Sequence, residues 1–295
     1  MQKQIMNWRL NGMNLSERKM TIGLNEMSCV HSLRSLSAVD VPTRCSFEED
    51  SWHFDYYFAP NSSRTLLVFF PAALVPNKRY VPAFHRWSWA FKLPEYDVLC
   101  LSDPTLYLHE HMLGGWLQGT SKDWVLMRCL SHLRAFQSLR NYTHIVLCGF
   151  SMGGFVAIQA ATLCPDNIIG TRVMAYAENP QISLIKYCHR RHMNLIASVC
   201  YGVSSLDKVS SDFNPRLDIV SLIASQNYVP PGLVVIKEGD THHHGVQLQH
   251  LRSGLQLFDQ SVLGLEVIPM SIDSSSHTPL TLQGMRDRIG RMLRR

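Results

Sequence analysis

One stretch in the middle of the chain, residues 145–158, constrains the fold more than any other. It opens with a short β-branched apolar run, as expected for a buried strand. It closes with an apolar, alanine-rich segment before Pro165, as expected for a helix. Between the two lies Gly149-x-Ser151-x-Gly153, whose small residues let a strand and a helix pass closely. The pattern predicts a sharp turn that exposes the hydroxyl of Ser151 at the positive end of the helix.

Strand, Gly149-x-Ser151-x-Gly153 and helix together resemble the nucleophile elbow of the α/β-hydrolase superfamily. The resemblance covers about residues 60–295 and implies an α/β fold, with a doubly wound, mostly parallel sheet. More loosely, segments 102–105, 115–116 and 179–181 are similar to parts of hydrolase-like proteins associated with bacterial surface-polysaccharide synthesis.

The rest of the chain alternates between strand and helix patterns. Aromatic and polar residues alternate over 45–58, which predicts a leading hairpin. Further strands are predicted at 66–70, 96–101, 171–177, 233–237 and 265–269. We expect residues 1–40 to form an N-terminal extension of unassigned role. Residues 41–295 then form the α/β-hydrolase domain, with 182–228 as a helical, lid-like insertion.

Two further candidate catalytic residues follow predicted strands, in the order serine, acid, histidine that the resemblance implies. Asp240 comes just after the strand at 233–237, and His277 follows the strand at 265–269. Ligand sites of open α/β sheets lie at the carboxyl ends of the strands, so the three side chains are expected to meet. A serine hydroxyl needs a base to become a nucleophile, and the base needs an acid to orient it. We predict Ser151 as nucleophile, His277 as base and Asp240 as acid.

Alternatives exist for two of these roles. Glu178 ends the strand after the elbow helix and Glu238 lies two residues before Asp240, so either could be the acid. His242 or His244 could replace His277 as the base.

Residues 240–244, with one aspartate and three histidines, also carry metal-ligand chemistry. Adjacent loop residues rarely all face one ion, and no His-Glu-x-x-His motif accompanies them. A phosphate-binding Gly-rich loop and a dinucleotide fingerprint are also missing from the sequence. We therefore predict no metal and no cofactor.

The resemblance also implies an oxyanion hole made of backbone N–H groups. One comes from the residue after the serine, Met152, and the other from the loop after the strand at 66–70, at Ala72 or Ala73. His85 and Arg86 lie shortly after that loop, and Trp116 lies in a glycine-containing loop. We expect these last three residues to contact the substrate.

Composition limits the partners and the compartment. The 295 residues are 46% hydrophobic, as in a soluble globular protein, and no stretch is long and apolar enough to span a membrane. The net charge of +5 (28 basic minus 23 acidic residues) is too small to indicate nucleic-acid binding. Eight scattered cysteines without Cys-x-x-Cys spacing indicate a reducing compartment. The first 20 residues lack an apolar signal core, so we expect a cytoplasmic protein.

These features together predict a serine esterase that cleaves a carboxylic ester through an acyl-enzyme, acting on a small molecule or an acyl group of a glycan. Two alternatives stay open: an acyltransferase with the same catalytic residues, and a non-catalytic hydrolase-like binding scaffold. The oligomeric state is left undefined.

Overall fold

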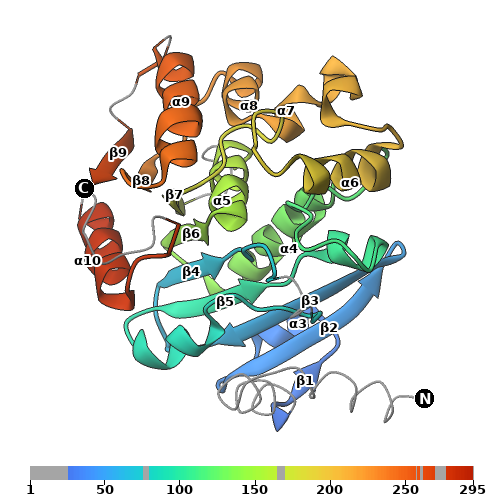
Figure 1. Ribbon diagram of the computed structural model, residues 1–295. Helices are drawn as coiled ribbons and strands as arrows, with labels where there is room; N and C mark the ends of the chain where they lie inside the picture. Colours follow the sequence, from blue (N-terminus) through green and yellow to red (C-terminus); the bar gives the residue numbers. More distant parts are fainter. Residues whose placement is uncertain are drawn as a thin grey trace.

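A computed structural model describes residues 26–75, 80–164, 170–256, 258–259, 262–269 and 277–294. Its centre is a sheet that runs from β1 at the bottom of Figure 1 to β9 at the upper left. Within the described residues the sheet has nine strands in the order β1-β2-β3-β5-β4-β6-β7-β8-β9. The strands are β1 (Cys29–Val30), β2 (Thr43–Glu49), β3 (Trp52–Ala59), β4 (Thr65–Phe69), β5 (Asp97–Leu101), β6 (His144–Phe150), β7 (Arg172–Glu178), β8 (Gly232–Lys237) and β9 (Leu263–Ile268).

The strand directions confirm the predicted mostly parallel sheet. All neighbours from β5 through β4, β6, β7 and β8 to β9 pair in parallel. The hairpin β2–β3 is antiparallel, and β3 joins the parallel part by antiparallel pairing with β5. The carboxyl ends of β6, β7, β8 and β9 therefore meet at one edge of the sheet, where ligand sites of such folds lie.

Helices connect the strands and cover the sheet (Figure 1). The helices are α3 (Leu33–Ser37), α4 (Val125–Arg140), α5 (Met152–Thr162), α6 (Arg190–Tyr201), α7 (Asn214–Leu217), α8 (Ile219–Gln226), α9 (Leu248–Leu255) and α10 (Leu282–Leu293). Shorter turns of 3₁₀ helix are η1 (Trp87–Lys92), η2 (Pro104–Leu108), η3 (Leu206–Lys208) and η4 (Ser211–Phe213), and η5 (His243–Gln247) is a π-helical turn that leads into α9.

The central strands feed two hydrophobic cores, one on each face of the sheet. In β6, Ile145 and Leu147 join the core with α4, α5, α8 and α9, whereas Val146 and Cys148 join the core with η1 and α10. Alternate side chains of a strand point to opposite faces, so a continuous apolar run is what a strand buried on both faces requires. This is why the apolar run before Gly149 is a sufficient strand signal.

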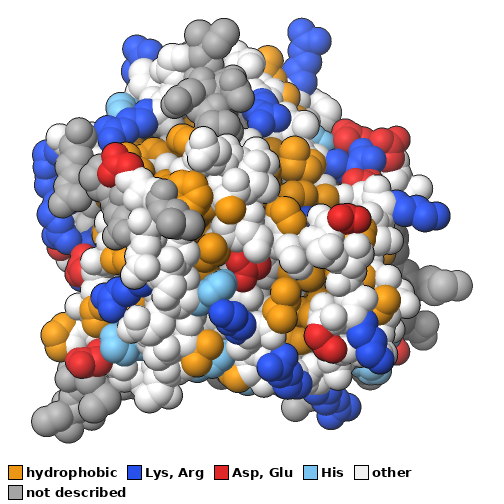
Figure 2. Space-filling view, turned by 90° about the horizontal axis from the view of Figure 1, so that it is seen from above, with side chains coloured by type: hydrophobic (Ala, Val, Ile, Leu, Met, Phe, Trp, Pro, Cys, Tyr) orange, Lys and Arg blue, Asp and Glu red, His pale blue; other side chains and the backbone are white. Residues whose placement is uncertain are grey.

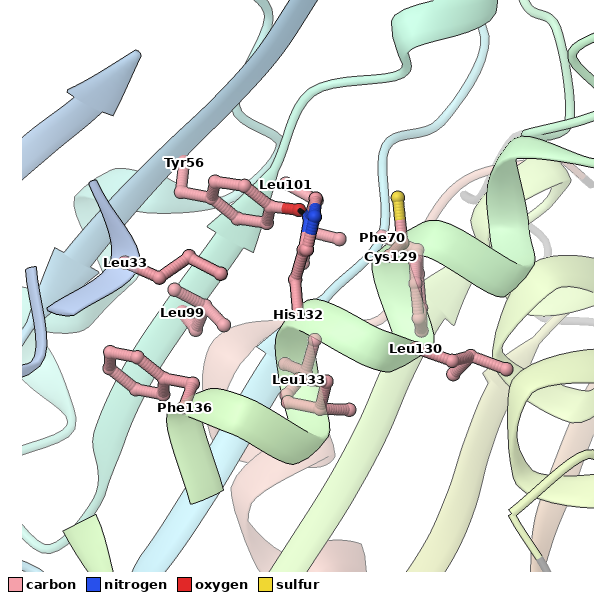
Figure 3. Close-up of a pocket in the computed structure, with 11 residues that line it drawn as sticks. Leu33, Tyr56, Phe70, Leu99, Leu101, Cys129, Leu130, His132, Leu133 and Phe136 are labelled. Atoms are coloured by element: carbon pink, nitrogen blue, oxygen red, sulfur yellow. Dashed lines mark hydrogen bonds between the residues drawn. The ribbon is translucent and has the colours of Figure 1, made fainter. Parts of the chain in front are cut away.

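A small cavity lies beneath α4, at the contact with α3 and the sheet (Figure 3). The space in it that a water molecule can enter is about 10 Å³, which is room for at most one water molecule. The Tyr56 hydroxyl and His132 Nδ1 are 2.7 Å apart beside it, so its polar groups are paired within the core. The cavity is part of the core packing and is too small for an organic ligand.

The predicted N-terminal extension and lid-like insertion can be placed in part. Residues 1–25 lie outside the described residues, but β1 pairs with β2 and α3 is joined to the main core through Leu36. The segment 182–228 carries α6, η3, η4, α7 and α8. The domain boundaries stay predictions. In the described part of the chain, none of the helices has the length and apolar character needed to cross a membrane.

Candidate active site

Ser151 sits at a strained turn between β6 and α5. Its backbone has φ 53° and ψ −116°, which side-chain-bearing residues rarely adopt. Glycines make the turn possible: a Cβ on Gly149 would lie 2.0 Å from the backbone of Gly153, and one on Gly153 would lie 2.7 Å from the carbonyl oxygen of Phe70. The sequence thus places a serine at the end of the strand, where the chain can turn only because the residues two before and two after it lack side chains.

Hydrogen bonds join Ser151, His277 and Asp240 in a line. Ser151 Oγ is 3.1 Å from His277 Nε2, and His277 Nδ1 is 2.5 Å from Asp240 Oδ2. Ser151 and Asp240 are buried, whereas the His277 side chain is 38% exposed. The structure therefore brings together the three residues that the sequence nominates, from loops after three different strands.

The segment that carries His277 is held by side chains at the ends of β7 and β8. Lys237 Nζ donates to Thr278 Oγ1 at 2.6 Å, and the Leu280 N–H donates to Glu178 Oε2 at 3.1 Å. The imidazole of His277 stacks on that of His243, with ring centroids 4.6 Å apart. These contacts fix the position of an otherwise exposed histidine.

The alternative acids occupy other positions. The buried Glu178 carboxylate pairs with Arg86, at 2.6 Å between Oε2 and Nη2, and Glu238 is exposed. Of the three carboxylates, Asp240 is the one that contacts His277 among the described residues. His242 Nε2 accepts a 3.1 Å hydrogen bond from Gln247 Nε2, so this nitrogen is already used outside the Ser151–His277–Asp240 line.

Two residues to which the sequence analysis assigned no role complete the site. Gln181 Nε2 lies 2.9 Å from Ser151 Oγ and 3.2 Å from His243 Nε2. His243 Nδ1 lies 2.9 Å from Asp240 Oδ1. The five side chains form a closed ring of hydrogen bonds. Gln181 lies just beyond the end of β7 and His243 three residues after Asp240, and these positions are the signals that could have identified them.

Burial and hydrogen bonding set the charge states in this ring. Burial alone would raise the pKa of Asp240, but hydrogen bonds from His243 and His277 outweigh it and hold that pKa below its usual range. Burial lowers the pKa of His243 against the opposing effect of Asp240. The ring thus contains an ionised carboxylate beside a neutral His243 at pH 7.

Backbone N–H groups beside the serine are available for an oxyanion. Met152 is the first residue of α5, so its N–H has no acceptor within the helix. In the described parts of the chain, the N–H groups of Ala72 and Ala73 have no hydrogen-bond partner. A Cβ on Gly114 would lie 2.5 Å from Met152 Sδ and 3.4 Å from Ala73 Cβ, which makes these three residues neighbours.

The three predicted substrate contacts have different surroundings. Arg86 is buried in its pair with Glu178, and its guanidinium lies 4.3 Å from the ring centre of Trp89. Burial and the adjacent Arg86 lower the pKa of His85 to about 3. A cleft beside the site is lined by segments 73–74, 109–116 and 187–195. Trp116 therefore lines this cleft, whereas His85 and Arg86 do not. The Trp116 Nε1–H donates to Gln181 Oε1 at 3.2 Å.

Asp240, His243 and His277 are also close enough to hold a metal ion, because their ligand atoms lie within 4.8 Å of one another. Both histidines, however, already use Nδ1 for hydrogen bonds with the Asp240 carboxylate. Hydrogen bonds therefore account for the closeness of these three side chains without a metal ion. The absence of a metal stays a prediction.

The sheet order, the strained serine turn and the comparison with solved structures define the class: the chain has the α/β-hydrolase fold. It is similar to the S-formylglutathione hydrolase of Agrobacterium tumefaciens, at 15% identity and a TM-score of 0.60, over 88% of this chain and 97% of that one. It is also similar to the capsule O-acetyltransferase of Neisseria meningitidis serogroup A, at 17% identity and a TM-score of 0.59, over 85% and 94%. An esterase/lipase from an uncultured bacterium matches at 12% identity and a TM-score of 0.54, over 89% and 88%. Neither a protein-family model nor a curated protein matches the sequence.

Proposed function

We propose that the protein is a serine esterase that cleaves a carboxylic ester through an acyl-enzyme. The observation that carries the proposal is the line from Ser151 Oγ to His277 Nε2, 3.1 Å, and from His277 Nδ1 to Asp240, 2.5 Å. A strained serine with a base in hydrogen-bond reach and an ionised acid behind the base is the arrangement that activates a hydroxyl.

The steps follow from these contacts. His277 Nε2 takes the Ser151 proton while Oγ attacks the ester carbonyl carbon, and the negative oxygen is held by the N–H groups of Met152 and of Ala72 or Ala73. The ester C–O bond then breaks, and His277 returns the proton to the leaving alcohol. His277 then deprotonates a water molecule that attacks the acyl carbon. The bond from that carbon to Ser151 Oγ breaks, the acid leaves, and Oγ takes the proton back from His277. Asp240 stabilises the imidazolium in both halves.

The test is labelling with a fluorophosphonate probe, together with hydrolysis of 4-nitrophenyl acetate. Wild type is expected to label and to turn over the ester, and Ser151→Ala and His277→Ala are expected to lose both. Ser131→Ala removes an exposed hydroxyl on α4 and serves as the matched control. Folded wild type that neither labels nor hydrolyses the ester would favour the non-catalytic scaffold.

An acyltransferase is the second candidate, with a sugar hydroxyl in place of water. Two observations favour it: a cleft of about 1250 Å³ beside the site, and the similarity of fold to a capsule O-acetyltransferase. Such a volume exceeds the roughly 300–1,000 Å³ of common small-ligand pockets. Mass spectrometry of products formed from an acetyl ester with and without an oligosaccharide acceptor separates the two: acetylated acceptor supports transfer, and acetate alone supports hydrolysis.

A further inference from the structure

A wide cleft borders the candidate active site. It has a volume of about 1250 Å³ and is formed by three segments: 73–74 after β4, 109–116 after η2, and 187–195, which includes the start of α6. Residues distant in the sequence thus share one hollow, and the helical segment 182–228 provides one of its walls.

Two residues that line the cleft contact the hydrogen-bonded ring around Ser151. Trp116 lines the cleft and donates to Gln181, whose amide in turn lies 2.9 Å from Ser151 Oγ. Tyr187 also lines it and lies against His243, with ring centroids 6.1 Å apart. An ester that reaches Ser151 therefore has its remaining part beside this cleft.

The lining of the cleft is basic. It carries Arg190, Arg191 and four histidines, and Glu110 is the one acidic residue among the described residues that line it. Arg191 is exposed and has no hydrogen-bond or ion-pair partner within the described ranges. Arg190 donates one hydrogen bond, from Nη1 to the Ile185 carbonyl oxygen. Guanidinium groups bind phosphate and carboxylate with two parallel hydrogen bonds, and a concave wall concentrates their field.

We propose that this cleft binds an ester that carries phosphate or carboxylate groups on the part beyond the scissile bond, such as an O-acylated anionic oligosaccharide. The inference rests on the proposed function, since it takes Ser151 as the reacting residue. The cleft volume fits several linked units, and Arg190 and Arg191 hold the anionic groups while the acyl group enters toward Ser151.

The decisive experiment compares wild type, Arg190→Gln/Arg191→Gln and Arg252→Gln. Figure 2 shows Lys and Arg side chains spread widely over the face seen from above, so a control for general attraction is required. Arg252 is an exposed arginine on α9 that does not line the cleft. The anionic probes are short-chain inorganic polyphosphate and oligogalacturonate, with neutral maltohexaose for comparison. Calorimetry measures binding to the Ser151→Ala form of each protein, which separates binding from catalysis.

We expect at least one anionic probe to bind and maltohexaose not to bind. The double variant should weaken that binding by about tenfold or more, and Arg252→Gln by less than twofold. In the active forms the same probe should compete with 4-nitrophenyl acetate, and the double variant should weaken that competition by a similar factor. Absence of binding by both anions, or equal weakening in the double variant and the control, overturns the proposal. Hydrolysis of the neutral ester with no anion binding would refute this inference alone, and anion binding without any ester hydrolysis would refute the proposed function alone.

The ring of hydrogen bonds carries a second, independent inference. The Trp116 indole N–H is donor only, so Gln181 must present its oxygen to Trp116 and its NH₂ group to Ser151 and His243. His243 Nε2 is then unprotonated, and its Nδ1–H donates to Asp240. Because Ser151 Oγ accepts from Gln181, its own proton is directed to His277 Nε2. We infer that Gln181 and His243 are positioning residues that select the reactive direction of the Ser151 hydroxyl.

Gln181→Glu tests this second inference with almost no change of shape. A carboxylate offers only acceptors, so the Ser151 hydroxyl would turn from His277 to Glu, and His243 would take up a proton at Nε2. We expect kcat to fall by about 100-fold at pH 8 and to recover partly as the pH is lowered. ¹⁵N spectra of labelled histidine should show His243 as the Nδ1–H tautomer in wild type and doubly protonated in the variant. Gln159→Glu, at another buried amide that donates to backbone carbonyls, should leave the pH profile and these spectra unchanged. Unaltered His243 signals and an unaltered pH profile in Gln181→Glu would overturn the assignment.

Discussion

Replacing Asp240 by asparagine tests which carboxylate supports His277. Asp240 accepts from two histidines, at 2.5 Å from His277 Nδ1 and 2.9 Å from His243 Nδ1. Asparagine has one oxygen and one NH₂ group, so it can accept from only one of them. Gln181 holds His243 in the Nδ1–H form, and the asparagine oxygen should therefore face His243. Its NH₂ group then faces His277 and forces the proton of that imidazole onto Nε2.

That tautomer cannot accept the Ser151 proton. Loss of the correct tautomer in a serine–histidine–aspartate site lowers kcat by about 10⁴-fold, or about 5.5 kcal/mol in activation free energy. Glu178→Gln is the matched change at the other buried carboxylate, which contacts Arg86 and the Leu280 N–H. We expect it to lower kcat less than about tenfold while it destabilises the fold, because the charge of a buried pair is lost.

The assay is steady-state hydrolysis of 4-nitrophenyl acetate at pH 8, with thermal unfolding of each variant recorded in parallel. A 10⁴-fold loss in Asp240→Asn with only a small loss in Glu178→Gln is the expected pair of results. The reverse pattern, in folded proteins, would show that Glu178 is the acid and would refute the assignment made from the hydrogen bonds.

Three further predictions concern stability. Arg86→Met should lower the free energy of unfolding by about 3–5 kcal/mol in urea titrations, because it leaves the buried Glu178 charge unpaired. The double variant Arg86→Met/Glu178→Met should lose less stability, and an equal loss in the two variants would contradict this reasoning. Gly149→Ala should prevent folding or reduce the melting temperature strongly, because the added Cβ would meet the Gly153 backbone at 2.0 Å, and wild-type melting would show that the turn is not as tight as described. His85 has a folded pKa of about 3 against an ordinary value of 6.5, so the unfolded chain binds a proton between these values and stability falls as the pH drops from 6.5 toward 3. His85→Leu should flatten that slope in urea titrations at pH 4 and 7, and an unchanged slope would assign it to other groups.

Most of the fold could be predicted from local patterns. The strands β4, β5, β6, β7, β8 and β9 and the hairpin β2–β3 lie within a few residues of their predicted positions, because apolar runs and alternating patterns report burial directly. The order of strands in the sheet could be anticipated only through the family resemblance. Pairing between strands such as β4 and β6, which lie about 80 residues apart, is decided by long-range contacts and not by local propensity.

The residues of the site also differ in whether local sequence patterns could identify them. Ser151 could be found because its strand, turn and glycines are adjacent in the sequence, and Asp240 and His277 because each follows a strand. Arg86 shows the limit of such reasoning. Its position shortly after the predicted oxyanion loop suggested a substrate contact, but the structure pairs it with Glu178, which follows 92 residues later. Nothing in the neighbourhood of either residue indicates that partnership.

The sequence by itself determined that a strand must turn sharply into a helix at Ser151, since only glycines tolerate the close approach on either side. Tertiary structure alone decided between Asp240 and the alternative acids, which way the Gln181 amide faces, and that Arg190 and Arg191 line the cleft. Those outcomes depend on distances between segments that are far apart in the chain. Hydrogen-bond directions follow from such distances and from the fixed donor and acceptor character of each atom, and not from the order of residues.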